Sequence, residues 1–411
     1  MSAVPALHIA PPPFLADPAL RAVLAALPGA RVVGGAVRDA LLGRAVADVD
    51  LATERRPQEV VAALRAAGLK AVPTGLDHGT VTAVADHRGF EVTTLRRDLA
   101  TDGRHAVVAF TDDWQADAAR RDFTINAMSL APDGAVFDYF GGIGDLRAQR
   151  VRFVGDPATR IAEDYLRVLR FFRFWARYGA GPPDEAATGA IAAAVPWLGR
   201  LSAERVWMEF KRILAAPDPR GAIMLMAELG VLAAVMPEGA APARLAALVA
   251  AGAPAEPLLR LAALLDGDAA RLAARLRLSA AERTRLQALR AAPSLPAEAD
   301  DATLRRALAC EQREVLIGRA WLAGGDAGLL ARLTAMPTPI FPLHGRDLRQ
   351  AGVAAGPGMG ALLRDLHVWW LAGGCTGNVR EELQRRLSAM RGGEGMMPSQ
   401  DGKNAPDQFA D

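Results

Sequence analysis

The triplet Asp48-Val49-Asp50 constrains this chain more than any other short stretch, because a Gly-Gly turn stands shortly before it. Side chains alternate faces along a β-strand, so both carboxylates are expected on one face, with Val49 in the core. Adjacent carboxylates repel each other unless a cation lies between them. An Asp-x-Asp strand behind a glycine turn therefore predicts a Mg²⁺ site beside a place for a phosphate group.

The glycine turn, Gly34-Gly35, follows a predicted strand and opens a predicted helix. Glycine lets the backbone approach a ligand closely, and free N–H groups at a helix start favour phosphate. Arg38 adds a charged fork for the same anion. The spacing is neither that of a Rossmann glycine loop nor that of a Walker loop. A tight strand–helix turn with a surface arginine is the alternative interpretation.

Strand and helix signals alternate along the first part of the chain and then give way to helices separated by Gly and Pro. Runs of β-branched residues predict strands, and apolar residues at helical spacing predict helices. The predicted strands are 31–33, 46–52, 79–85, 90–95 and 134–138; the predicted helices are 17–27, 36–42, 57–67 and 117–128. The polar stretch 98–113 is expected to be a mobile loop. The pattern predicts an α/β head followed by a long helical region.

Size and composition narrow the class of protein. A chain of 411 residues is too long for one core, and 51% hydrophobic with 23% charged residues is typical of a soluble globular protein. We expect no signal peptide and no membrane span, so the expected compartment is the cytoplasm. The net charge of +2 does not indicate nucleic acid, but eight arginines against three acids crowd the segment 147–177.

Several common catalytic and metal-binding patterns are missing from the sequence. Cys310 and Cys375 lack the spacing of a zinc site or a disulfide framework. The six histidines do not show metalloprotease spacing, and no nucleophile elbow of the hydrolase type occurs. These observations argue against metalloprotease and hydrolase chemistry.

A second polar cluster, from Arg120 to Ala127, falls in the predicted helix 117–128. Arg121 is a candidate phosphate ligand. Asp122 and Asn126 are one helical turn apart, so they are expected to share a face and to order the site through hydrogen bonds. An amphipathic surface helix is the alternative interpretation.

The segment 163–173 reads as a helix with one charged half and one apolar half. The charged half carries Asp164, Arg167, Arg170 and Arg173. An ionised Asp only accepts hydrogen bonds and an Arg only donates them, which matches the Watson–Crick edges of cytosine and adenine. Uracil and guanine present the reverse pattern and would leave buried groups unpaired. A salt-bridged, solvated helix face is the alternative.

Four motifs in this order resemble those of the class II tRNA nucleotidyltransferases (CCA-adding enzymes) and the related bacterial poly(A) polymerases. They are Gly34-Gly35-x-Val37-Arg38-Asp39, Asp48-x-Asp50, Arg121-Asp122-x-x-x-Asn126-Ala127 and Glu163-Asp164-x-x-Arg167-x-x-Arg170. The segments Asp138–Leu146 and Leu201–Arg205 are similar to a hinge and a neck-helix motif of the family. The resemblance is strong over residues 30–214 and weak beyond them.

The resemblance implies an α/β nucleotidyltransferase head, with a mixed sheet and helices, followed by an all-α neck, body and tail. The implied divisions are an N-terminal helix packing on the head (1–29), the head (30–146), a neck with the nucleotide-selecting helix (147–215) and a tRNA-binding body and tail (216–390). The end, 391–411, is expected to be disordered because it is rich in Gly, Pro, Ser, Asp and Asn.

The resemblance also implies roles for individual residues. The implied nucleotide ligands are Gly34, Gly35, Arg38, Arg121, Asp122, Asn126, Asp164, Arg167, Arg170 and Arg173. Among these, Asp164 and Arg167 would read the base. Asp48 and Asp50 would hold Mg²⁺ and act in catalysis, and Glu91 is our candidate for a third catalytic carboxylate.

The implied reaction is two-metal phosphoryl transfer, in which the 3′-OH of a tRNA attacks the α-phosphate of CTP or ATP. The stretch 98–113 is expected to help the switch from C to A. A poly(A) polymerase, or an enzyme that adds only CC or only A, remains open on the same scaffold. A non-catalytic RNA-binding protein is a third, more distant alternative.

Overall fold

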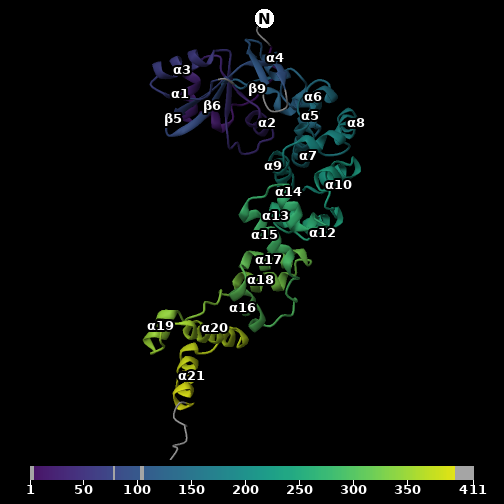
Figure 1. The fold of residues 1–411 in the computed structure, drawn as a ribbon. Helices are drawn as coiled ribbons and strands as arrows, with labels where there is room; N and C mark the ends of the chain where they lie inside the picture. Colours follow the sequence, from purple (N-terminus) through teal and green to yellow (C-terminus); the bar gives the residue numbers. More distant parts are fainter. Residues whose placement is uncertain (1–3, 77–78, 102–105, 394–411) are drawn as a thin grey trace, which may run out of the picture. The chain divides into compact units, whose positions relative to one another are not determined.

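The computed structural model describes residues 4–76, 79–101 and 106–393 (Figure 1). The chain divides into two compact units, 1–287 and 288–411, which we describe separately. The first unit contains a mixed sheet followed by helices. The second unit is helical throughout its described part.

An eight-stranded mixed sheet forms the head, in the strand order β1-β10-β9-β2-β3-β6-β5-β4. Only the β3–β6 pair of this sheet is parallel. The strands are β1 (Leu7–His8), β2 (Arg31–Val33), β3 (Asp50–Thr53), β4 (Lys70–Gly75), β5 (Thr80–Ala85), β6 (Arg88–Thr94), β9 (Met128–Leu130) and β10 (Ala135–Asp138). The mixed sheet with helices agrees with the predicted head.

Helices α1 (Pro18–Ala26) and α3 (Pro57–Ala66) pack against β5, as Figure 1 shows, whereas α2 (Gly35–Leu41) packs against β2 and β9. A short 3₁₀ helix, η1 (Pro13–Ala16), precedes α1. Asp17 begins α1 as expected, because its carboxylate accepts hydrogen bonds from the N–H groups of Ala19 and Leu20.

The strand predicted at 46–52 begins only at Asp50, so the expectation that Asp48 and Asp50 share a strand face is wrong. Strand β2 runs antiparallel to β3 and pairs Val33 with Asp50. At Gly34, with φ of 70°, the chain leaves the sheet for α2. Residues before Asp50 therefore have no strand to pair with, and Asp48 lies in the irregular segment 44–49.

The mobile loop expected at 98–113 is also wrong, because most of it forms a hairpin of β7 (Arg96–Thr101) and β8 (Ala106–Phe110). Residues 102–105 lie outside the described part of the chain. The run Ala-Val-Val-Ala-Phe of β8 has the β-propensity that the polar composition of the whole stretch concealed.

The helix predicted at 117–128 is broken. It consists of α4 (Trp114–Ala119) and the 3₁₀ turn η3 (Thr124–Asn126). Between them, Phe123 is extended and forms an antiparallel bridge with Phe153. This tertiary pairing outweighs local helical propensity.

The helix predicted over 163–173 is broken as well, at Asp164, whose φ of −156° is extended. Helix α6 (Pro157–Glu163) ends before it, and α7 (Leu166–Tyr178) begins after it. Asp164 therefore lies between two helices, where its Oδ1 accepts a hydrogen bond of 3.1 Å from the N–H of Leu166. Helix α7 packs against α9 (Ala203–Leu214).

The first unit contains further helices after the last strand of the sheet. They are α5 (Gly142–Arg147), α8 (Glu185–Ala194), η4 (Val195–Arg200), α10 (Arg220–Glu228), α11 (Val231–Val235), α12 (Pro242–Ala250), α13 (Pro257–Leu264) and α14 (Ala269–Arg275), with α15 (Ala280–Ala291) crossing the boundary between the units. Buried Phe123, Phe153 and Phe171 form an aromatic core where α7 meets the head.

The second unit has two hydrophobic clusters, one around Leu304 and Leu333 and the other around Leu366 and Trp370. Its helices are α16 (Asp301–Cys310), α17 (Arg313–Leu322), α18 (Ala327–Ala335), α19 (Gly345–Gln350), α20 (Pro357–Ala372) and α21 (Val379–Gly393). Helix α21 extends into the end expected to be disordered, 391–411, of which residues 394–411 lie outside the described part.

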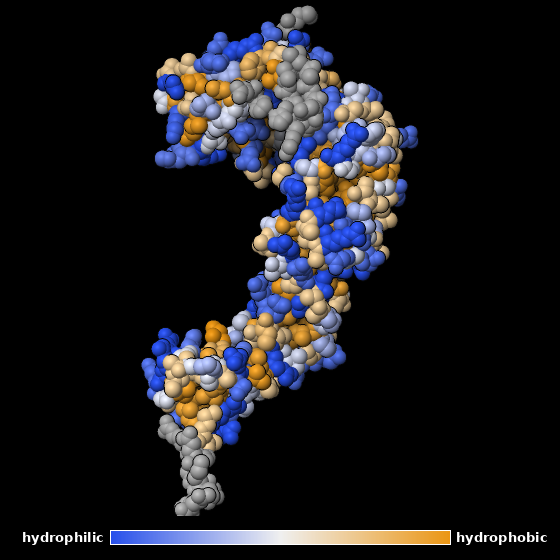
Figure 2. All heavy atoms as spheres, in the orientation of Figure 1, coloured by the Kyte–Doolittle hydropathy of each residue, from blue (hydrophilic) through white to orange (hydrophobic). Residues whose placement is uncertain are grey.

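Among the described residues, no helix has the length and apolar character needed to cross a membrane. On the face drawn in Figure 2, hydrophilic and hydrophobic side chains are interspersed over the helices.

Asp145 of α5 joins the head to the segment that follows it. Its side chain is fully buried and accepts hydrogen bonds from Thr124 Oγ1 at 2.6 Å, Arg150 Nε at 2.7 Å and Arg152 Nε at 2.9 Å. Arg152 also donates to the Phe140 carbonyl at 2.7 Å. The buried carboxylate thus fixes η3 to Arg150 and Arg152, in the segment that follows α5.

We predict that Asp145→Ala lowers the free energy of unfolding of the protein by about 2–3 kcal/mol, because the buried Thr124 hydroxyl and the partly exposed Arg150 and Arg152 lose their shared acceptor. Arg150→Ala is the matched control. The Arg150 side chain is 50% exposed, so its loss should cost about 1 kcal/mol or less. Urea unfolding followed by circular dichroism measures both, and equal costs would contradict the assigned role of Asp145.

Candidate active site

A cavity of about 490 Å³ lies where the head meets α7. It brings together many of the predicted site residues from segments far apart in the sequence. The predicted residues lining it are Gly34, Gly35, Arg38, Asp50, Arg121, Asp122, Asn126, Asp164, Arg167 and Arg170. Asp48, Glu91 and Arg173 do not line it. Arg120, Leu166, Phe174 and Arg205 line it and were not predicted as site residues.

The Gly34-Gly35 turn forms part of the cavity lining. A Cβ atom at Gly34 would lie 3.1 Å from the Arg121 guanidinium, and one at Gly35 would lie 3.4 Å from that of Arg38. Gly34 also has a positive φ of 70°, which L side chains rarely adopt. Both glycines therefore let two arginines approach the backbone closely.

Arg38 is buried and is held by acceptors on two sides. Its Nη1 donates to Asn126 Oδ1 at 2.6 Å, and its Nε donates to Asp39 Oδ1 at 3.0 Å. Its guanidinium is therefore already fixed in direction without any ligand, which is the form of preorganisation that anion binding requires.

Asp117, which the sequence did not single out, holds Arg121 in place. Its buried carboxylate lies 3.4 Å from Arg121 Nη2 and accepts a hydrogen bond from Arg120 Nε at 2.8 Å. Burial lowers the pKa of Arg121, and the charge of Asp117 opposes that shift. An arginine stays protonated in any case, so the cavity has a fixed positive charge near Asp50.

Of the three predicted catalytic carboxylates, Asp50 lines the cavity, whereas Asp48 and Glu91 do not. Partial desolvation raises its pKa above the ordinary value, the charges of Glu91 and Asp48 raise it further, and Arg121 acts in the opposite direction. Glu91 is close because β6 pairs in parallel with β3, with Val92 opposite Leu51. Asp48 is exposed in the irregular segment before β3.

These three carboxylates fit a magnesium ion by their chemistry, since Mg²⁺ prefers oxygen ligands and commonly shares them with phosphates and water. Desolvation and, after it, the charge of Glu91 raise the pKa of Asp50, and a bound cation would offset both effects. Within the described residues, no group of three His, Cys, Asp or Glu side chains is gathered closely enough to complete a metal site by itself. The donors match the ion, and the remaining ligands would have to come from a substrate or from water.

A buried ion pair connects the head to α7. Asp122 is 8% exposed and accepts hydrogen bonds from Arg170 Nε at 2.8 Å and from a second Arg170 nitrogen. The expected bond with Asn126 is present, with Nδ2 donating to Asp122 Oδ1 at 3.1 Å. Burial alone would raise the pKa of Asp122, but Arg170 and the hydrogen bonds outweigh it and lower the pKa. Asp122 is therefore ionised.

Asp164 and Arg167 both line the cavity, but they do not pair with each other. Asp164 Oδ2 accepts a hydrogen bond from Arg205 Nη2 at 2.7 Å. Arg167 pairs with Glu163 and donates to the Arg160 carbonyl at 2.6 Å. Arg205 lies in the 201–205 segment that resembles a neck motif, which was the one sequence signal for its presence near the site.

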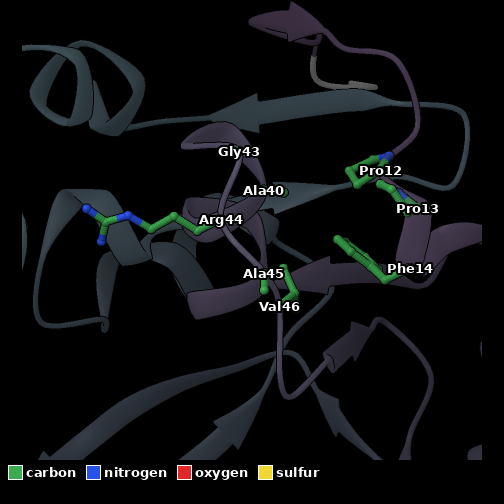
Figure 3. A pocket seen from close by; sticks show the side chains of 8 residues that line it. All are labelled: Pro12, Pro13, Phe14, Ala40, Gly43, Arg44, Ala45 and Val46. Atoms are coloured by element: carbon green, nitrogen blue, oxygen red, sulfur yellow. The ribbon is translucent and has the colours of Figure 1, made fainter.

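Arg173 lies one turn beyond the cavity. Its Nε is 3.2 Å from Glu209 of α9, and it lines a second cavity of about 390 Å³ instead. A third cavity of about 410 Å³ lies beside the segment that leads to Asp48 (Figure 3). Pro12, Pro13 and Phe14 lie there opposite Ala45 and Val46, and its lining is mainly apolar.

Two protein families match parts of the chain. Residues 30–152 match the family described as "Poly A polymerase head domain". Residues 183–241 match "Probable RNA and SrmB- binding site of polymerase A".

Among curated proteins, the mitochondrial CCA tRNA nucleotidyltransferase 1 of Mus musculus is 38% identical over 376 residues, covering 84% of this chain and 83% of the mouse protein. The CCA-adding enzyme of Bacillus licheniformis is 38% identical over 203 residues, covering 48% of this chain and 49% of its own length. Among solved structures, the Bacillus stearothermophilus CCA-adding enzyme in complex with CTP superposes with a TM-score of 0.70 and 26% identity, covering 92% of this chain and all of the other.

We predict a coupling of about 2 kcal/mol between Asp122 and Arg170 in a double-mutant cycle of alanine variants, because the ion pair is buried and doubly hydrogen-bonded. The pair of Asp218 and Arg220 is the control. Arg220 also donates hydrogen bonds to Asp218 through Nε and Nη2, but the side chains of Asp218 and Arg220 are 49% and 45% exposed, so their coupling should be much smaller. Chemical unfolding measures both cycles, and equal couplings would contradict the importance of the head–α7 contact.

Proposed function

Because the chain belongs to the family of CCA-adding tRNA nucleotidyltransferases, we propose that it adds C and A, from CTP and ATP, to the 3′ end of tRNA. The observation that carries the proposal is the 490 Å³ cavity, which joins the carboxylate of Asp50 to the Asp164 and Arg167 side chains. The group that would act in phosphoryl transfer and the groups that would select the base therefore line the same cavity.

Gly34, Gly35 and Arg38 would hold the triphosphate, with Arg121 beside them. The turn gives close backbone approach, and both guanidiniums are fixed in advance by Asn126 and Asp117. Positioning of this kind accounts for most of the catalysis in phosphoryl transfer, since little covalent chemistry is left to the protein.

Asp48 and Asp50, with Glu91 beside them, would hold Mg²⁺, which when bound neutralises charge on the reacting phosphate and its leaving group. The protein's own part is to orient the α-phosphate towards the 3′-OH of the tRNA. The 3′-OH loses its proton to solvent as the new ester bond forms at that phosphorus, while the bond to pyrophosphate breaks on the opposite side. Arg38 and Arg121 would neutralise the charge that builds up on the departing pyrophosphate.

Asp164 and Arg167 would select the base. A carboxylate accepts about four hydrogen bonds and a guanidinium donates five, so both side chains keep capacity beyond the contacts with Arg205 and Glu163. Acceptor and donor together match cytosine and adenine. Arg170 would contribute indirectly, because Asp122 holds it against the head.

A poly(A) polymerase is the second candidate, since the head matches a family described by that name. Incubation with CTP, ATP and tRNAs ending before CCA, after C or after CC, followed by sequencing of the products, separates the two. Addition that stops at CCA supports our proposal. A long A tail supports the second candidate, and no addition would contradict both.

We predict that Asp50→Ala or Asp48→Ala lowers the rate of nucleotide addition on the order of 10³-fold or more, because the metal loses a ligand. The midpoint of thermal unfolding should stay close to that of the wild type, since both side chains are exposed. Asp133→Ala removes an exposed carboxylate elsewhere in the head and should keep its activity. Full activity of either metal-site variant would refute the assignment.

We predict that Arg167→Ala loses discrimination of CTP and ATP against UTP and GTP by about 10- to 100-fold in kcat/KM, because the fixed donor is gone. Arg65→Ala, which removes an exposed arginine of α3, is the control and should discriminate as the wild type does. Unchanged discrimination in Arg167→Ala would place base selection elsewhere.

A further inference from the structure

The second cavity, of about 390 Å³, has no role in the reaction as described so far. It continues from the first one, because both are lined by Arg38 and Phe174. The first cavity takes the N-terminal half of α7, whereas the second takes its C-terminal half, with Arg173, Arg177 and Tyr178. Arg212 of α9 completes its charged lining.

The lining carries an excess of positive charge. Four guanidiniums face the second cavity, those of Arg38, Arg173, Arg177 and Arg212. The carboxylates next to them are Asp39, at 3.0 Å from Arg38, and Glu209, at 3.2 Å from Arg173 and 3.4 Å from Arg212. The single carboxylate of buried Glu209 is thus the ion-pair partner of both Arg173 and Arg212. An anion would balance the remaining charge, and guanidiniums bind phosphate oxygens especially well.

The aromatic rings in the wall are already covered. The guanidiniums of Arg38 and Arg44 lie 4.2 Å and 5.0 Å from the centre of the Tyr178 ring. That of Arg173 lies 4.6 Å from the Phe174 ring, and the two rings stack on each other. The bases of a single-stranded nucleic acid bind proteins by stacking on aromatic side chains whose faces are open. The second cavity therefore favours a phosphate group over an RNA base.

The in-line geometry of the transfer indicates that the second cavity lies on the side of the α-phosphate from which pyrophosphate departs. The acceptor oxygen and the departing oxygen lie in line on opposite sides of the α-phosphorus. If Arg38 contacts the part of the triphosphate that departs, then the space beyond Arg38, away from Asp50, receives the leaving group and not the tRNA.

The arginines also lead from the interior to the solvent. The side-chain exposure is 9% for Arg38, 19% for Arg173 and 53% for Arg212, and Arg177 is exposed as well. A charged ligand would move outward along groups that are progressively better hydrated, so each transfer costs little desolvation.

We propose that the second cavity is the release site for pyrophosphate, which passes from Arg38 to Arg177 and Arg212 after each addition. The proposal rests on the proposed function, since pyrophosphate is the product of that reaction. It assigns Arg177 and Arg212 a part in product release that neither tRNA nor CTP binding requires.

The test combines Arg177→Ala with Arg212→Ala in the full chain, with Arg65→Ala as the control for loss of an exposed arginine. Inhibition of CTP addition by inorganic pyrophosphate is measured with Mg²⁺ and a tRNA lacking CCA. We expect the inhibition constant of the double variant to rise about tenfold, since two charged contacts are lost. The KM for tRNA should change less than about twofold, and Arg65→Ala should behave as the wild type.

A raised KM for tRNA with an unchanged pyrophosphate inhibition constant would overturn the proposal in favour of an RNA backbone site. No change in either constant would overturn it too. Calorimetry with inorganic pyrophosphate and Mg²⁺, without RNA, gives a readout independent of activity, and the double variant should again bind about tenfold more weakly. If the wild type adds no nucleotide but shows this difference in binding, the proposed function fails while the anion site stands.

Discussion

The buried ion pair between Asp122 and Arg170 is the contact on which the rest of the site depends. Asp122 also accepts a hydrogen bond from the side-chain Nδ2 of Asn126, and the side-chain Oδ1 of Asn126 accepts one from Arg38. A continuous series of hydrogen bonds therefore runs from α7 to the glycine turn. Because ionised Asp122 only accepts hydrogen bonds and Arg38 only donates them, the Asn126 amide must turn its Nδ2 to Asp122 and its Oδ1 to Arg38. The site is thus ordered before any nucleotide arrives.

Much of the fold could be predicted from the sequence, because the signals were local. The α/β head, the mixed sheet and the helical region beyond it followed from β-branched runs, helical periodicity and the resemblance to a family. The predicted secondary structure was wrong where contact with a segment distant in sequence determines the backbone conformation. Asp48 left the strand because β2 turns away at Gly34, and Phe123 became extended because it pairs with Phe153.

The site was predicted only in part, because its motif residues have a local sequence pattern and the residues that support them do not. Motif residues such as Gly35, Arg38, Asp50 and Arg167 do meet in one cavity. The partners that hold them were not recognised. Asp117 lies four residues before Arg121, a spacing that ordinary surface helices share, and Arg205 is 41 residues from Asp164. Residue types at fixed spacing indicate chemistry, but a buried carboxylate that serves as a support has no pattern of its own.

We propose that phosphoryl transfer and base selection lie on different elements, with Asp50 on β3 and with Asp164 and Arg167 around the start of α7. The most direct test is equilibrium binding of CTP, ATP, UTP and GTP to Asp50→Ala in the presence of tRNA. The expected result is the wild-type preference for CTP and ATP in a protein that adds no nucleotide. Loss of that preference together with the chemistry would contradict the separation.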